Sequence, residues 1–137
     1  MVSTVEWKNG AVRLLDQSRL PEFVEFLDCR DYQTVADAIR RLKVRGAPAI
    51  GVTAAMGVAL GAQTIAVSDS EAFAKEVLVI CDHLAATRPT AVNLFWAIER
   101  MKRLLASLRM QPIMSIKSFL LKESQAILDE DIALCKA

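Results

Sequence analysis

An arginine and a run of small residues stand at the entrance to the most apolar stretch of the chain. Arg45, Gly46 and Ala47 directly precede Pro48, and proline suits the first position of a helix because the amide hydrogen that it lacks has no helical partner there. The positive end of such a helix attracts anions. Gly46 leaves the backbone open to a ligand, and the Arg45 guanidinium can pair with two phosphate oxygens. These residues predict a phosphate site, although the same letters also fit a plain turn after a solvated arginine.

A second arginine stands on a comparable turn. Pro89 disfavours helical geometry at Arg88 and restarts the chain as a new helix. Thr90 and Asn93 can help to hold an anion or can simply cap and pack that helix, and the second role is the simpler one. Two guanidinium groups on turns before helix starts, those of Arg45 and Arg88, are able to hold one sugar phosphate from two sides.

Other chemistry is hard to place on this sequence. We find no Ser/His/Asp set, no Walker-type loop, no His-Glu-x-x-His and no obvious acid/base pair of carboxylates. Cys29, Cys81 and Cys135 are too widely spaced for a disulfide framework or a zinc site, and we interpret each as a small buried residue. His83 lies off the apolar stripe of its helix and receives no role. The residues predict an anion-binding protein, and they do not specify a reaction.

Composition limits the class of protein. The chain has 137 residues, 53% of them hydrophobic, and a net charge of +1, which fits one domain with a substantial core. Balanced charges and the lack of a basic run argue against nucleic-acid binding. The stretch from Ala47 to Ala62 is shorter than the ~20 residues that span a bilayer, so we expect a buried helix and no membrane association. The N-terminus has no apolar signal core, which favours the cytoplasm.

The elements that must position the two arginines predict an α+β fold in a single domain of residues 1–137. Residues 1–30 are expected to form a small antiparallel β-sheet, with a hairpin turn at Asn9-Gly10 and a third strand at Phe23–Asp28. Residues 31–137 are expected to form about five helices. Their predicted spans are 32–44, 48–64, a third ending near Thr87, a fourth restarted by Pro89, and a last one from Pro112 onward.

Local signals refine these helices. Thr34 with Asp37 resembles a capping box, and Ser68 or Ser70 can cap the third helix. We expect Phe95 and Trp96 in the core or at an interface, and the charges of the last helix on a solvated face. The predicted apolar faces comprise Val35, Ile39 and Leu42; Phe73, Val77, Ile80, Cys81 and Leu84; Leu94, Ile98, Met101, Leu105 and Leu108; and Ile113, Ile116, Leu120, Ile127 and Leu134. Three glycines in the second helix indicate close helix packing or space for a ligand.

Three blocks of the sequence, in this order, resemble the N-terminal part of methylthioribose-1-phosphate isomerases. They are VRLLDQ at 12–17 followed by Leu20-Pro21, RGAPAIG at 45–51 and RPTAVNLFWA at 88–97. The similarity covers nearly the whole chain. The wider family also contains ribose-1,5-bisphosphate isomerases and the regulatory subunits of the eukaryotic initiation factor two-B exchange factor.

The resemblance implies an aldose-ketose isomerase of methionine salvage. It would convert 5-methylthioribose 1-phosphate to 5-methylthioribulose 1-phosphate without a metal or nucleotide cofactor, and would act as a homodimer in the full-length form. By position in the family motifs, Arg45, Gly46, Ala47 and Arg88 would bind the substrate. The family's catalytic cysteine and aspartate belong to a C-terminal Rossmann-like domain that this sequence lacks, and Cys135 does not correspond to that cysteine.

This departure leads to three expectations. The natural chain is expected to continue past Ala137, where the last helix stops without a C-cap. The 137 residues alone are expected to be inactive, because no acid/base pair is present. A regulatory domain without catalysis remains an alternative, as does a ribose-1,5-bisphosphate isomerase, whose second phosphate would need a further basic contact.

Overall fold

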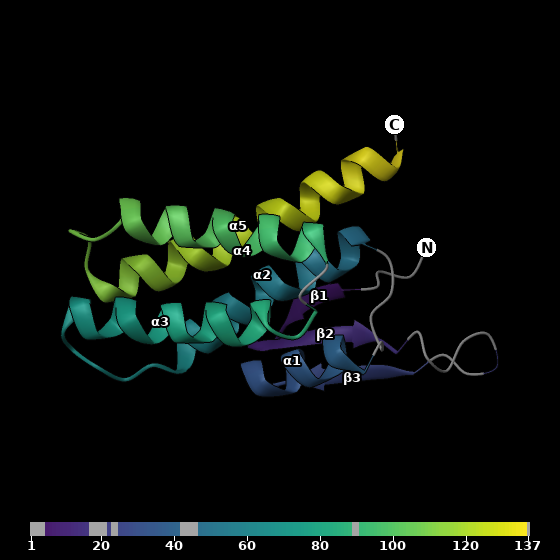
Figure 1. The fold of residues 1–137 in the computed structure, drawn as a ribbon, viewed down its shortest axis with the longest axis horizontal. Helices are drawn as coiled ribbons and strands as arrows, with labels where there is room; N and C mark the ends of the chain where they lie inside the picture. The colour runs from purple at the N-terminus through teal and green to yellow at the C-terminus, as the bar shows by residue number, and fades with distance from the viewer. Residues whose placement is uncertain (1–4, 17–21, 23–24, 42–46, 89–90, 137) are drawn as a thin grey trace.

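The computed structural model describes residues 5–16, 22, 25–41, 47–88 and 91–136, apart from the side chains of 47, 48 and 132–136. Within these ranges the chain forms a small sheet followed by helices (Figure 1). The strands are β1 (Val5–Lys8), β2 (Ala11–Leu15) and β3 (Phe26–Cys29), and the helices are α1 (Tyr32–Arg40), α2 (Ala47–Thr64), α3 (Ser70–Ala85), α4 (Val92–Ser107) and α5 (Ile113–Lys136). The predicted α+β class is therefore confirmed.

The sheet is antiparallel in the order β1-β2-β3. Asn9 and Gly10 both have positive φ, 52° and 74°, which is the geometry of the tight hairpin turn that such a pair favours. The expected hairpin is confirmed. The third strand begins later than predicted, at Phe26, and residues 23–24 lie outside the described ranges. Val12 and Leu14 of the central strand are fully buried, because one face of the sheet packs on the helices.

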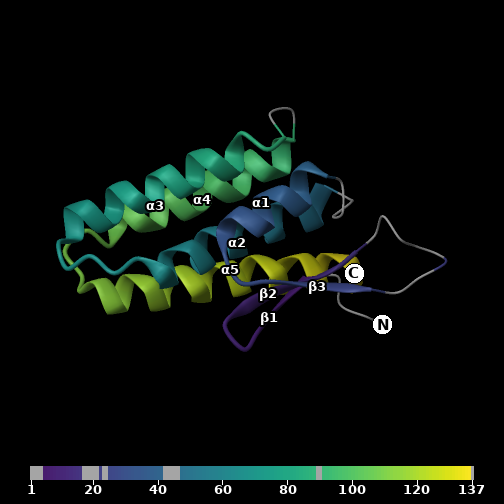
Figure 2. The same ribbon diagram turned by 90° about the horizontal axis from the view of Figure 1, so that it is seen from below.

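Helix α2 is the centre of the fold. It contacts α1, α3, α4, α5 and the first two strands, and every residue from Ile50 to Ala62 is buried. Figures 1 and 2 show it surrounded by the other helices and the sheet. Small residues make this possible, since a Cβ added at Gly57 would lie 3.0 Å from a Val35 methyl carbon of α1. The prediction of a helix buried on every side is confirmed for this span.

Most of the predicted apolar residues of the other helices are buried, but Leu108 and Ile113 are only partly buried. Leu42 and the side chain of Leu134 lie outside the described part of the chain. The caps of these helices differ from those predicted. The expected apolar residues of α3 are all buried, as are Leu94, Ile98, Met101 and Leu105 of α4. The cap of α1 is Asp31, whose carboxylate accepts from the Thr34 amide at 2.7 Å, so the predicted Thr34/Asp37 capping box is wrong. Asp69, and neither of the neighbouring serines, caps α3. In each case a carboxylate one to three residues from the predicted hydroxyl accepts the hydrogen bond from the free amide instead.

Two further expectations concern the end of α1 and two aromatic residues of α4. Helix α1 ends at Arg40, with Arg41 as its C-cap, and does not extend to Val44 as predicted. Phe95 and Trp96 are 40% and 50% exposed, so neither belongs to the core of this chain, and the alternative location at an interface stays a prediction. They lie on the first turns of α4, where no other described element covers them completely. None of the described helices is both long enough and apolar enough to cross a bilayer.

Candidate functional site

The start of α2 is the first component of the candidate site. This helix begins at Ala47, directly after the Arg45-Gly46 pair. Arg45 and Gly46 lie outside the described residues, as does the side chain of Ala47, so their part in the site stays a prediction. The first amides of an α-helix have no carbonyl partner within the helix. The first turn of α2 therefore has amides that form no hydrogen bond within the helix, Pro48 excepted because it has no amide hydrogen.

The first turns of α2 and α4 cross in contact. A Cβ added at Gly51 would lie 2.9 Å from the backbone oxygen of Asn93 and 3.6 Å from the Cβ of Ala97. No side chain larger than hydrogen fits at this crossing without a shift of backbone, since Cβ atoms do not approach other heavy atoms so closely. Both views of the fold place the start of α2 and the start of α4 at the same end of the helical bundle (Figures 1 and 2). Glycine at position 51 thus sets how close the two helix starts come.

The turn that carries Arg88 is fixed by hydrogen bonds on both sides. The Thr87 hydroxyl donates to the Leu84 oxygen at 2.6 Å, and the Thr87 amide donates to the same oxygen at 3.2 Å. The Ala91 amide then donates to the Arg88 oxygen at 3.0 Å. Thr87 is only 8% exposed, so the last turn of α3 anchors this loop to the core. The sequence prediction that Arg88 is held on a turn is consistent with this geometry.

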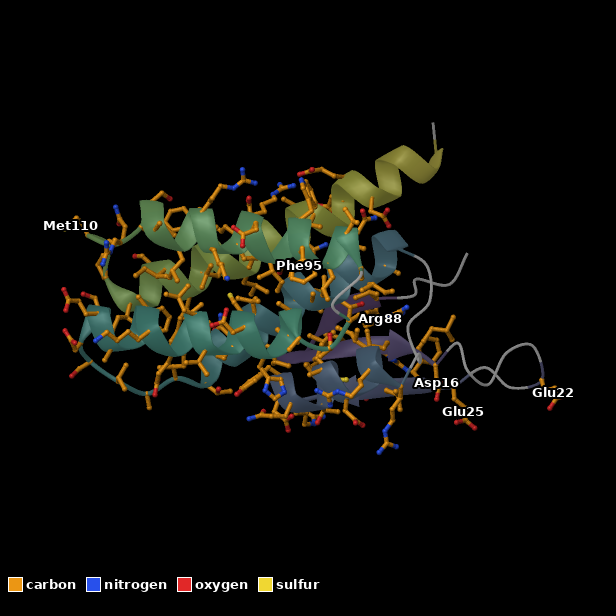
Figure 3. All side chains as sticks on the ribbon, in the orientation of Figure 1. Asp16, Glu22, Glu25, Arg88, Phe95 and Met110 are labelled. Carbon is orange, nitrogen blue, oxygen red and sulfur yellow. The ribbon has the colours of Figure 1, made fainter. Side chains whose placement is uncertain are left out.

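The Arg88 side chain is partly buried. Among the residues that the structure describes, none forms a hydrogen bond or ion pair with its guanidinium. Figure 3 shows Arg88 at the end of the bundle that carries the starts of α2 and α4, with Met110 at the opposite end. A partly buried guanidinium without a protein partner retains its capacity to bind an anion.

A cavity of about 330 Å³ adjoins the crossing of α2 and α4. Its volume falls in the range of small-molecule sites. Three helices line it, with residues from the first two turns of α2, the first two turns of α4 and the later part of α5. The lining residues are Gly51, Val52, Asn93, Trp96, Ile127, Glu130 and Asp131.

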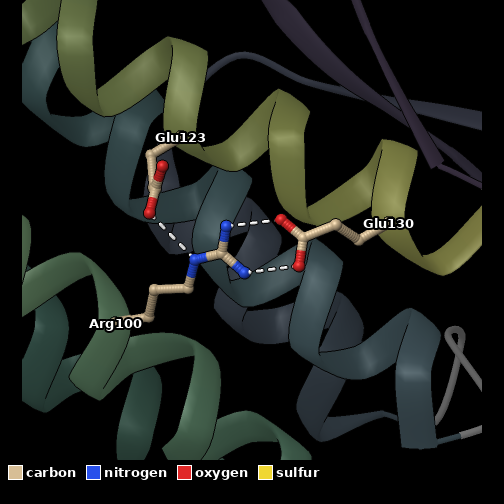
Figure 4. Close-up of polar contacts among 3 residues, drawn as sticks. All are labelled: Arg100, Glu123 and Glu130. Carbon is tan, nitrogen blue, oxygen red and sulfur yellow. Dashed lines mark hydrogen bonds and ion pairs between the residues drawn. The ribbon is translucent and has the colours of Figure 1, made fainter.

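One arginine organises the wall of this cavity (Figure 4). Arg100 of α4 donates to Glu130 of α5 through both terminal nitrogens, at 2.8 and 2.6 Å, and its Nε donates to Glu123 at 2.8 Å. The same guanidinium lies 5.4 Å from the centre of the Trp96 ring, a cation–π contact. Arg100 therefore ties α5 to α4 and holds two of the side chains that line the cavity.

The electrostatics of this cluster follow from the paired geometry. Hydrogen bonding by Arg100 lowers the pKa of Glu130, and the attraction between the two charges adds to this effect. The sequence analysis missed the cluster, because it assigned the charges of the last helix to a solvated face. Glu123 and Glu130 stand seven residues apart, which places them on one face of a helix. That spacing was visible in the sequence, but the arginine facing them on another helix was not.

The two cysteines whose side chains are described are unsuited to nucleophilic chemistry. Cys29 and Cys81 are buried free thiols. Burial raises the pKa of Cys29 to about 11, with repulsion from Asp31 and Asp28 contributing, and burial raises the pKa of Cys81 to about 12. Both stay protonated at neutral pH, so the prediction of inert buried cysteines is confirmed for these two. The side chain of Cys135 lies outside the described part of the chain.

Neither His83 nor a cluster of metal ligands adds to the candidate site within the described residues. His83 is exposed and stacks edge-on against Tyr32, with ring centres 5.4 Å apart. Within the described ranges no three His, Cys, Asp or Glu side chains gather closely enough to hold a metal ion. The described residues therefore place the starts of two helices and the Arg88 turn at one end of the bundle, next to a cavity with a mixed apolar and acidic wall.

Comparison with known proteins gives close relatives along the whole chain. The chain is 50% identical over 134 residues to a protein of Geobacter sulfurreducens named methylthioribose-1-phosphate isomerase, and 51% identical over 133 residues to one of the same name from Trichlorobacter lovleyi. These matches cover 98% and 97% of the chain. They cover only 39% and 38% of the relatives, so the chain spans less than half of their length.

Solved structures share the fold at a similar level. The crystal structure of 5-methylthioribose 1-phosphate isomerase from Pyrococcus horikoshii superposes with a TM-score of 0.92 at 39% identity, covering 95% of this chain and 36% of that one. The structure of the translation initiation factor eIF-2B subunit delta from A. fulgidus superposes with a TM-score of 0.88 at 38% identity, and the match covers 96% of this chain and 38% of the subunit. Residues 43–137 match the Initiation factor 2 subunit family. By this match over more than half of its length, the chain belongs to the Initiation factor 2 subunit family.

Proposed function

We propose that the chain is the N-terminal part of a methylthioribose-1-phosphate isomerase and that it binds the substrate's phosphate between the starts of α2 and α4. The observation that carries this proposal is the contact of Gly51 with the Asn93 carbonyl, which brings the two helix starts to one end of the bundle. Arg88 lies at that end with a guanidinium that no described residue pairs. The names of the relatives supply the substrate class.

In this proposal the chain binds and orients the sugar, and other groups perform the proton transfer. Converting an aldose phosphate to a ketose phosphate moves a hydrogen from C2 to C1, which needs an acid/base pair in reach of both carbons. The buried thiols of Cys29 and Cys81 are protonated and enclosed. We assign the acid and the base to the portion of the relatives that this chain does not span, so the 137 residues alone bind substrate without turnover.

Four residues take named roles. Arg88 pairs with the phosphate, and Arg45 pairs with it from the other turn. The amides of Gly46 and Ala47 donate to the same anion at the start of α2. As part of this proposal, the longer protein is a homodimer of the cytoplasm that needs no metal or nucleotide cofactor.

The decisive experiment is calorimetric titration of the chain with 5-methylthioribose 1-phosphate. Arg88→Ala removes one charge-assisted contact of about 1.5 to 3 kcal/mol, so affinity should fall by roughly 10-fold to 150-fold. Arg109→Ala is the matched control, because it makes the same change in net charge beside Met110 at the opposite end of the bundle. Equal affinities for Arg88→Ala and the unaltered chain would remove Arg88 from the site.

A regulatory role without catalysis is the second candidate, and the likeness to the A. fulgidus initiation factor subunit favours it. A regulatory domain of this family has no requirement for a sugar phosphate held at the two helix starts. Saturable binding of 5-methylthioribose 1-phosphate that depends on Arg88 supports the isomerase, whereas no binding by the unaltered chain would favour the regulatory domain.

A further inference from the structure

The cavity beside the helix crossing has a defined position relative to the proposed phosphate site. It begins at Gly51, four residues into α2 from its first residue Ala47, and a rise of 1.5 Å per residue makes that separation about 6 Å. The carbon skeleton from a C1 phosphate to a substituent on C5 of a folded pentose spans roughly 7 Å, given covalent bonds of about 1.5 Å. A sugar anchored by its phosphate at the start of α2 can therefore extend its far end into this cavity.

The wall of the cavity favours an apolar group at that far end. Val52 and Ile127 contribute aliphatic surface, and Trp96 contributes an indole ring that is 50% exposed. Arg100 lies against the ring, with its guanidinium carbon 5.4 Å from the ring centre, and Glu130 in turn holds that guanidinium. Sulfur makes favourable contacts with aromatic rings, and a methyl group gains free energy on leaving water.

The charged groups of the wall disfavour an anion. Glu130 and Asp131 both line the cavity. The Glu130 carboxylate is engaged by Arg100 through two hydrogen bonds, so Arg100 is not free to bind a second anion. No hydrogen bond or ion pair within the described residues neutralises Asp131. A phosphate placed here would meet, at short range, one negative charge that no described residue compensates.

We propose that this cavity receives the 5-methylthio end of the sugar and rejects a 5-phosphate, so that Trp96 and Asp131 set the specificity. The inference rests on the proposed function, because the phosphate at the helix starts fixes which end of the sugar enters. It selects a neutral thioether substituent over the second phosphate of ribose 1,5-bisphosphate. Trp96 supplies the attraction and Asp131 supplies the repulsion.

The test follows the tryptophan indole signals of the 137-residue chain by NMR. The chain has two tryptophans, so the signal that remains in the Trp7→Phe variant is that of Trp96. Four probes are titrated: 5-methylthioribose 1-phosphate, ribose 1-phosphate, unphosphorylated 5-methylthioribose and ribose 1,5-bisphosphate. The indole of Trp96 reports the cavity, and the amides of Arg88 and Ala91 report the phosphate site. Both methylthio compounds should shift the Trp96 signal, and ribose 1-phosphate should shift only the amides.

Variants test the two specificity residues separately. Trp96→Ala should weaken binding of 5-methylthioribose 1-phosphate by about fivefold to twentyfold, the value of burying a methyl and a sulfur against a ring, and should leave ribose 1-phosphate unchanged. Phe95→Ala is its control, since Phe95 is comparably exposed on the same helix and does not line the cavity. Asp131→Asn should strengthen the binding of ribose 1,5-bisphosphate by about threefold to tenfold. Asp129→Asn makes the same charge change outside the cavity lining and should have a smaller effect.

Each outcome decides one of the two proposals. A Trp96 signal that responds equally to ribose 1-phosphate and to the methylthio compound overturns the inference, and so does one that responds to neither. If 5-methylthioribose shifts Trp96 while no phosphate compound shifts the amides, the cavity assignment stands and the proposed phosphate site fails. Shifts of the amides alone, with equal affinity for all three phosphorylated probes, support the phosphate site and refute the specificity residues.

Discussion

Replacing Gly51 by alanine tests the contact on which the candidate site depends. The new methyl group would lie 2.9 Å from the Asn93 oxygen and 3.4 Å from its carbonyl carbon. Both atoms belong to the backbone of α4, so relief requires the two helices to separate. Overpacking of this kind costs about 1 to 3 kcal/mol, and the better helix propensity of alanine returns about 1 kcal/mol. We expect a net loss of about 1 kcal/mol and a Tm lower by about 4 °C.

Gly61→Ala is the matched control for this substitution. Its added Cβ would lie even closer to a neighbour, 2.7 Å, but the neighbour is the δ-methyl of Ile80, the far end of a flexible side chain. Rotation of the Ile80 side chain about χ2 moves that methyl away, and the remaining contacts, at 3.2 Å to the Ile80 γ2-methyl and to a Tyr32 ring carbon, need only small shifts of side chains. The propensity gain therefore offsets much of the cost. Both glycines are interior to the same buried helix. Both variants replace a glycine by an alanine, so the difference between their stabilities reports the effect of a contact with backbone atoms relative to a contact with a side chain.

The assay combines thermal unfolding, followed by circular dichroism, with calorimetric titration of 5-methylthioribose 1-phosphate. Gly51→Ala should lower both Tm and affinity, because separating the helices moves the start of α2 away from the turn of Arg88. Gly61→Ala should change neither by much. The reasoning is refuted if Gly51→Ala is as stable as Gly61→Ala, or if it loses stability while its affinity for the phosphosugar is retained.

Two further predictions concern titratable groups. Arg100 lowers the pKa of Glu130 in the folded chain. The pair therefore contributes stability above the ordinary glutamate pKa of about 4.3, and this contribution is lost as the pH falls through the lower pKa of the folded state. Glu130→Gln should show a smaller fall in Tm on acidification than the unaltered chain, and identical pH profiles of Tm would contradict the pairing. Burial raises the pKa of Cys29 to about 11 and that of Cys81 to about 12, so in a Cys135→Ser background a thiol reagent at neutral pH should label neither residue until denaturant is added. Rapid labelling of the native chain, measured by mass spectrometry, would show that the thiols are accessible.

Much of the fold could be predicted from local pattern. The Asn-Gly turn, the apolar stripe of α3 and most of the apolar stripe of α4 depend on residues close in sequence, and the structure confirms them. The caps were less predictable. Asp31 and Asp69 compete with hydroxyl residues one to three positions away, and only the backbone geometry selects which side chain reaches the free amides.

Part of the candidate site could likewise be predicted from local sequence, and part of it could not. The sequence identified Arg88 on a turn, because proline restricts the residue before it, and it identified glycine-mediated packing in α2. It could not show that Gly51 meets Asn93, that Arg100 reaches across to Glu123 and Glu130, or that Trp96 is exposed. Each of these facts depends on how the helices are placed beside one another, and periodicity along one helix carries no information about its neighbour.

The sequence by itself therefore determined the elements, their buried faces and the residue types able to bind an anion, since these follow from chemistry within a few residues along the chain. Only the tertiary structure decided which helix starts lie together, which charges are paired and which apolar side chains remain uncovered. Those properties depend on the packing of α2, α4 and α5, and packing is a property of surfaces brought together from distant parts of the chain.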